Sequence, residues 1–101
     1  MNVNCVSGSF AATGQSATFA PYANRQERAF NMSLWGTFVG TVQLERSFDK
    51  GSTWLAITAL GNSISFTGPC TETFEEPEYG VIYRLNCTAY TSGTANYRLS
   101  N

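Results

Sequence analysis

The acidic residues at positions 72–78 form the one cluster of like charges in the sequence. They are Glu72, Glu75, Glu76 and Glu78. Carboxylates grouped in this way can bind calcium or, as a pair, act as acid and base in glycoside hydrolysis. Neighbours in an extended segment point to opposite sides, however, so Glu75 and Glu76 do not converge on one ligand. We interpret the group as a solvated turn, with contact to a basic patch on a partner as the alternative.

The residues that usually supply nucleophilic or metal-dependent catalysis are scarce in this chain. The sequence has no histidine, and its only lysine is Lys50, so no convincing nucleophile–base pair can be named. Its cysteines (Cys5, Cys70 and Cys87) are an odd number at wide spacings, which indicates neither a disulfide framework nor a zinc site. We therefore expect reduced, mostly buried cysteines, no metal, no cofactor and no enzymatic activity.

A sharper motif runs from Ser47 to Trp54 and reads Ser-Phe-Asp-Lys-Gly-Ser-Thr-Trp. Its spacing predicts a hairpin in which Asp49 accepts hydrogen bonds from turn amides and Gly51 supplies a positive φ. Ser47 and Thr53 would bond across the turn, and Trp54 would pack beneath it as a lid on the core. The pattern resembles the Asp-box, a hairpin signature of sialidase propellers. In that family the box is structural, and one copy cannot build a propeller, so the motif predicts a hairpin without glycosidase activity.

Aromatic side chains supply further candidates for a partner interface. Trp35 falls on the opposite face from the apolar residues of its segment. It is therefore either an interface anchor or a rim residue packed under a loop. Tyr22 and Tyr79 are the other aromatic candidates, and Glu75 and Glu76 complete the predicted set.

The composition indicates one small domain. A chain of 101 residues with 43% hydrophobic side chains can build one core but not two. Only 13% of the residues are charged and the net charge is −1, which excludes a nucleic-acid binder that relies on phosphate neutralisation. No segment has the ~20 apolar residues that span a bilayer. Met1 to Phe10 lacks the features of a signal peptide. We expect a protein made in the cytosol, with no membrane partner.

Short runs of β-branched and aromatic residues, separated by Gly, Pro, Asn and Ser, predict an all-β domain. Alternation of apolar and polar residues is clearest in residues 29–35, 38–48, 80–90 and 95–100. Residues 54–60 are apolar on both faces, which predicts a central strand covered on each side. Shorter candidates are residues 3–10, 17–20, 64–66 and 71–74.

Together these runs predict a single antiparallel β-sandwich of about eight strands. Two topologies fit the spacing, a jelly roll and an immunoglobulin-like Greek key. The run from Gly80 to Tyr83 resembles the tyrosine corner of immunoglobulin-like sandwiches, in which the hydroxyl bonds back to upstream backbone.

The first 24 residues differ from the rest because none of them is charged. We divide the single domain into an uncharged N-terminal arm or edge strands (1–24) and a sandwich core (25–101). An uncharged strand lacks the side chains that normally block pairing at a sheet edge. The arm therefore either closes the domain's own sheet or lies on a neighbour in an assembly.

Beyond Phe30 the motifs follow a recognisable order. After the first strand come residues 35–42, 44–49 and 53–54, then Phe74-Glu75-Glu76-Pro77, then residues 83–87 and 96–100. This order resembles a family of small β-sandwich proteins encoded in the structural-gene regions of tailed bacteriophages.

The resemblance implies a virion structural protein. Its favoured role is a capsid decoration (cement) protein that stabilises the shell by bridging subunits. The implied partners are the major capsid protein or other virion proteins, with the chain present as a homo-oligomer or in many copies per particle. The alternative is a tail, fibre or head-vertex module that contacts a host glycan or protein.

Overall fold

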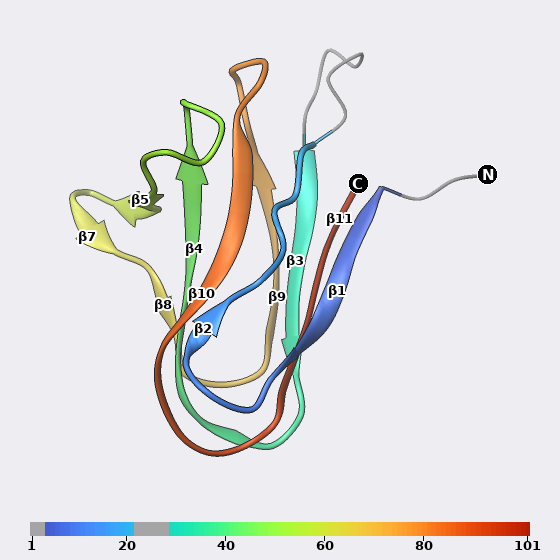
Figure 1. The fold of residues 1–101 in the computed structure, drawn as a ribbon, viewed down its shortest axis with the longest axis vertical. Coiled ribbons are helices and arrows are strands. Elements are labelled where there is room, and N and C mark those ends of the chain that lie inside the picture. Colours follow the sequence, from blue (N-terminus) through green and yellow to red (C-terminus); the bar gives the residue numbers. More distant parts are fainter. Residues whose placement is uncertain (1–3, 22–28) are drawn as a thin grey trace.

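The computed structural model describes residues 4–21 and 29–101. These residues form two antiparallel sheets that enclose one core, so the prediction of an all-β sandwich is confirmed. Figure 1 shows the long strands running along the vertical axis, with most connections gathered at the two ends of the molecule.

The first sheet contains four strands, and all of its neighbours pair antiparallel. Its order is β1 (Cys5–Phe10), β11 (Ala95–Ser100), β3 (Ala29–Trp35) and β9 (Cys70–Glu75). The ranges predicted for β3 and β11 are confirmed to the residue, because both strands alternate strictly between buried and more exposed side chains over most of their length.

The second sheet is built around two long strands. Its order is β2 (Gly14–Gln15), β10 (Ile82–Gly93), β4 (Phe38–Ser47) and β5 (Leu55–Ala56), and β8 (Ser65–Phe66) also pairs with β4. A separate small hairpin joins β6 (Thr58–Ala59) to β7 (Asn62–Ser63). Two register shifts interrupt the pairing of β10 with β4, between Cys87 and Ala89 and between Tyr90 and Ser92.

The strand order is that of a jelly roll. If the short segments β5 to β8 are counted as one position, the first sheet reads 1-8-3-6 and the second reads 2-7-4-5. This arrangement places sequence-distant strands side by side in both sheets and distinguishes the fold from the immunoglobulin-like alternative. The structure thus selects one of the two predicted topologies.

The core is formed by the inward-facing residues of both sheets and contains a chain of aromatic rings. The ring centroid of Phe30, on the first sheet, lies 4.5 Å from that of Tyr83 on the second sheet. Phe19 and Phe74 lie 5.5 Å and 5.8 Å from the same ring. The Phe30–Tyr83 contact joins the two sheets, and Phe19 and Phe74 pack against the same ring.

The N-terminal arm closes the domain's own sheets over its described part. β1 pairs along its length with β11, and the amide of Phe19 donates to the carbonyl of Tyr83 at 2.7 Å. Ser16 also bonds to the backbone of Leu85 through both its amide and its hydroxyl. Of the two predicted roles for the arm, the intramolecular one is therefore present. Tyr22 lies outside the described residues.

The prediction of a covered central strand at residues 54–60 is wrong. This range holds only β5, at the edge of the second sheet, and β6, in the separate β6–β7 hairpin, and it ends in a turn where Leu60 has a φ of 52°. Ile57 packs against the core, but Leu55 is half exposed and Leu60 is fully exposed. A segment with apolar residues on both faces is therefore not always buried on both faces.

The cysteines also depart in part from expectation. All three are free thiols, but only Cys87 is buried, whereas Cys70 is half-buried and Cys5 is exposed on β1.

Candidate functional site

The hairpin between β4 and β5 has the internal bonding that its sequence predicts. The Ser47 hydroxyl donates to Oδ1 of Asp49 at 2.7 Å, and the Thr53 amide donates to the same oxygen at 2.8 Å. The hydrogen bond from Ser47 is the main cause of the lowered pKa of Asp49. Gly51 has a φ of 97° and its amide donates to the Ser47 hydroxyl at 2.8 Å. Ser47 and Thr53 thus meet through Asp49.

Trp54 does not form a lid on the core as predicted. Its ring lies over the guanidinium of Arg84, 4.3 Å from the ring centroid, on the outer face of the second sheet. Nε of Arg84 donates to Oε1 of Glu45 at 2.8 Å, and the side-chain amide of Asn86 donates to Oε2 of Glu45 at 3.0 Å. The stack covers an ion pair and fastens the hairpin to β10, which is a structural role.

Glu76 corrects the prediction of a solvated acidic turn. Only 1% of its surface is exposed, and the Tyr83 hydroxyl donates to its Oε1 at 2.6 Å. Nη1 of Arg46 donates to the same oxygen at 3.1 Å, and the Glu78 amide donates to Oε2 at 2.8 Å. Three donors satisfy the buried carboxylate, so Glu76 is unavailable to a partner and instead fastens the β9–β10 loop to the core.

The same contact shows how far the tyrosine-corner resemblance extends. Tyr83 does bond back to an upstream residue, but its acceptor is the Glu76 side chain and not the backbone. Burial, followed by the neighbouring Glu76, raises the pKa of Tyr83, so the phenol stays protonated and acts as a donor.

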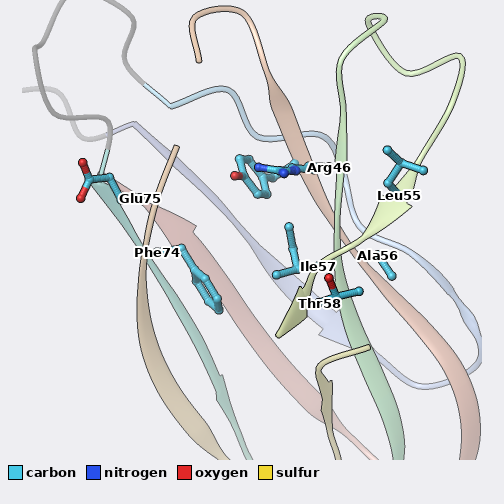
Figure 2. Close-up of a pocket in the computed structure, with 8 residues that line it drawn as sticks. Arg46, Leu55, Ala56, Ile57, Thr58, Phe74 and Glu75 are labelled. Atoms are coloured by element: carbon cyan, nitrogen blue, oxygen red, sulfur yellow. The ribbon is translucent and has the colours of Figure 1, made fainter. Parts of the chain in front are cut away.

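A half-open pocket of about 350 Å³ lies beside this cluster, between β9 and the β5–β6 segment. Figure 2 shows the Phe74 side chain turned toward Ile57, while Glu75 at the rim points away. The lining residues are Arg46, Leu55, Ala56, Ile57, Thr58, Phe74, Glu75 and Tyr83. Its exposed lining is more polar than apolar, and its charged atoms belong to Arg46 and Glu75.

The predicted interface residues do not gather in one place. Tyr79 is 70% exposed in the β9–β10 loop, and Glu75 is exposed at the end of β9 nearby. Trp35 is 48% exposed at the opposite end of the sandwich, where β3 turns into β4 (Figure 1). About half of its surface is covered, which fits a rim residue packed under a loop as well as an interface anchor.

Sequence reasoning missed two exposed apolar side chains, Phe48 and Leu55, at the end of the sandwich that carries the β9–β10 loop. Phe48 follows β4 and Leu55 lies on β5, and both are about half exposed. The β4–β5 and β9–β10 connections lie at the same end of the molecule (Figure 1). We call Phe48, Leu55 and Tyr79 the apolar end. Alternation could not have found Phe48, because it is the last residue of the predicted range 38–48 and is in phase with the inward-facing Val42 and Leu44.

Raised pKa values at two tyrosines and two cysteines predict a loss of stability at high pH. Burial is the main cause of a raised pKa at Tyr83, Tyr97, Cys70 and Cys87. Unfolded tyrosines and cysteines ionise near pH 10 and 8.5, so above these values the unfolded state binds fewer protons than the folded one. The free energy of unfolding should hold below about pH 8 and fall as pH rises further.

Thermal melts under reducing conditions from about pH 7 to about pH 11 check this dependence. Tyr83→Phe should flatten the part of the curve near pH 10, since the variant has no phenol at this position to ionise. A melting temperature that rises with pH, or a pH dependence that Tyr83→Phe leaves unchanged, would contradict the link between these raised pKa values and stability.

A comparison with protein-family models, curated proteins and solved structures finds no match to this chain. No helix of the described residues is long and apolar enough to cross a membrane. Within residues 4–21 and 29–101, no group of three or more histidine, cysteine or acidic side chains is arranged to hold a metal ion.

Proposed function

We propose that this chain is a structural protein of a bacteriophage particle, most specifically a capsid decoration protein that bridges neighbouring subunits of the shell. The observation that carries the proposal is the apolar end, in which Phe48, Leu55 and Tyr79 are exposed on segments at one end of a small, charge-poor domain. The sequence resemblance to phage structural-region proteins supplies the particle as the setting.

Burial of the apolar end against a partner would supply the binding energy. Full burial of a large apolar side chain contributes about 1.5–3 kcal/mol, and these three side chains are already partly covered. The gain per copy is therefore modest. Repeated over a symmetric shell, contacts of this size stabilise the assembled state by mass action.

The loops that carry these residues are fastened to the sandwich. Asp49 holds the β4–β5 hairpin from within, and Glu76 holds the β9–β10 loop through Tyr83 and Arg46. Because these loops are already ordered, they would lose little conformational entropy when a partner binds.

Binding to purified, expanded and empty capsids of the encoding phage tests the proposal. The wild-type protein should co-sediment with the shells and raise their melting temperature. Leu55→Ser/Tyr79→Ser should weaken this binding at least tenfold. Trp35→Ser, at the opposite end, is the matched control and should bind as the wild type does.

Failure of the wild-type protein to associate with shells would overturn the decoration role. Equal loss of binding in the control variant would instead show that the apolar end is not the contact.

A second candidate, a glycan-binding module of a tail, fibre or head vertex, is favoured by the surroundings of Trp35. The tryptophan lies at the end of the outer face of the first sheet, opposite Asn96 and beside short polar side chains such as Ser33 and Thr71. An exposed indole next to hydrogen-bonding groups can stack on a sugar ring. Binding to an array of bacterial polysaccharides that Trp35→Ala abolishes, without any binding to capsids, would establish this role instead.

A further inference from the structure

The four sheet edges of the sandwich differ in how they are protected. In the second sheet the edge segments β2, β5 and β8 are two residues long, and such short edges give little template for another strand. In the first sheet both edges, β1 and β9, are six residues long. These two are the edges on which another strand could pair.

β9 carries the usual protection of an edge strand. Glu72 and Glu75 are exposed on it, and Glu72 lies on the inward face, two residues from Phe74. Pro69 and Pro77 flank the strand. Carboxylates that would meet their own copies, with prolines at both ends, oppose self-pairing here.

β1 has none of these features. It reads Cys-Val-Ser-Gly-Ser-Phe, without charge or proline, and no charged residue precedes it in the chain. In the described part of the chain it pairs with β11 alone, and Cys5, Ser7, Gly8 and Ser9 are exposed. Its second edge therefore presents backbone donors and acceptors without any device that excludes a further strand.

The strand is also held in place by its own domain. Asn4 donates from its side chain to the carbonyl of Ala20 at 2.6 Å, and its carbonyl accepts from the Asn101 amide at 3.0 Å. At the other end the Phe10 ring packs 4.8 Å from that of Tyr97. An edge fixed at both ends is preorganised for pairing, because little further ordering is needed.

We propose that two copies of this chain pair through their β1 edges, antiparallel and about a two-fold axis, so that their two first sheets become one continuous sheet. A second copy is the occupant because an isologous contact must complement itself, and a strand without charges meets its own copy without repulsion. The pairing does not require the chain to be a capsid protein.

The pleat limits the register of this contact. Directly opposed residues of an antiparallel pair point to the same face, so Ser7 must oppose an outward-facing residue of the other copy. The outward residues are Cys5, Ser7 and Ser9, since Val6 and Phe10 pack inward. Ser7 therefore opposes Ser7 or Ser9 of the second copy in the two registers that use most of the strand.

The contact is small, because a six-residue strand pair falls below the interface area of stable dimers. We expect weak association of the free protein, with a Kd on the order of 10⁻⁴ M. Copies held close together on a common scaffold would reach the required local concentration.

Charged substitutions at the outward-facing positions of β1 test the pairing, with self-association measured by analytical ultracentrifugation. The wild-type protein should dimerise as its concentration is raised toward the millimolar range. Ser7→Lys/Ser9→Lys and Ser7→Glu/Ser9→Glu should each associate at least tenfold more weakly, because like charges oppose each other in both registers. An equimolar mixture of the two variants should recover dimers, which a folding defect in either variant would not produce.

Thr71→Lys/Thr73→Lys is the matched control. It places the same charges on the outward positions of β9, and its self-association should equal that of the wild type. A wild-type protein that stays monomeric at every concentration, charged β1 variants that associate as the wild type does, or a mixture that fails to dimerise would each overturn the proposal.

Discussion

Replacement of Glu76 by alanine should lower the free energy of unfolding by about 2–4 kcal/mol. The substitution leaves the buried Tyr83 hydroxyl without its acceptor and removes the acceptor of the Glu78 amide. It also removes the carboxylate that pairs with Arg46. Because the Arg46 side chain is 36% exposed, water can solvate part of its charge, and the cost stays below that of a fully buried pair.

Urea unfolding of the variant and of the wild type measures this difference. Glu78→Ala is the matched control, since Glu78 is exposed on the same loop and its side chain should contribute less than about 0.5 kcal/mol. A double-mutant cycle with Tyr83→Phe should show coupling, because the two side chains share one hydrogen bond. Equal stability of Glu76→Ala and Glu78→Ala would mean that the buried cluster does not hold the loop.

Replacement of Gly93 by alanine should cost about 3 kcal/mol or more. Gly93 ends β10 with a φ of 87°, a conformation that L-residues rarely adopt. A Cβ at this position would collide with the carbonyl oxygen of Thr37 and lie 2.8 Å from Cα of Phe38. Both neighbours are backbone atoms of the adjacent chain segment, so relief requires movement of the β10–β4 pairing itself.

Two other glycines separate the causes of this cost. Gly61→Ala has almost the same φ, 86°, with no atom within 4 Å of the added Cβ, so it should cost only the conformational term of about 1 kcal/mol. Gly68→Ala has neither the positive φ nor a close neighbour and should change stability by less than about 0.5 kcal/mol. Thermal or urea unfolding of the set would contradict the close approach if Gly93→Ala were no worse than Gly61→Ala.

Local patterns in the sequence predicted the elements that depend on local chemistry. β3 and β11 follow from alternation, because each side chain is either in the core or outside it. The Ser47–Trp54 hairpin follows from residues that bond within the turn itself. The prediction that Trp54 covers the core is wrong, because the ring packs on Arg84, which is remote in the sequence and so is not indicated by the local pattern.

The features that were not predicted depend on contacts between distant segments. Glu76 reads as a solvated residue until β9 and β10 bring it against Tyr83 and Arg46. The local pattern of residues 54–60 predicts a central strand, but the topology places β5 at a sheet edge and β6 in a separate hairpin. The choice between jelly roll and Greek key likewise depends on which strands pair across the sheet, which a single sequence does not encode in its local pattern.

The proposal of a structural role in a phage particle is tested most directly by where in such particles the protein is found. Quantitative mass spectrometry of separated heads and tails, from purified particles of the encoding phage, measures both location and copy number. A decoration protein should be present in heads on the order of hundreds of copies, in proportion to the capsid subunits. Its absence from purified heads would contradict the account.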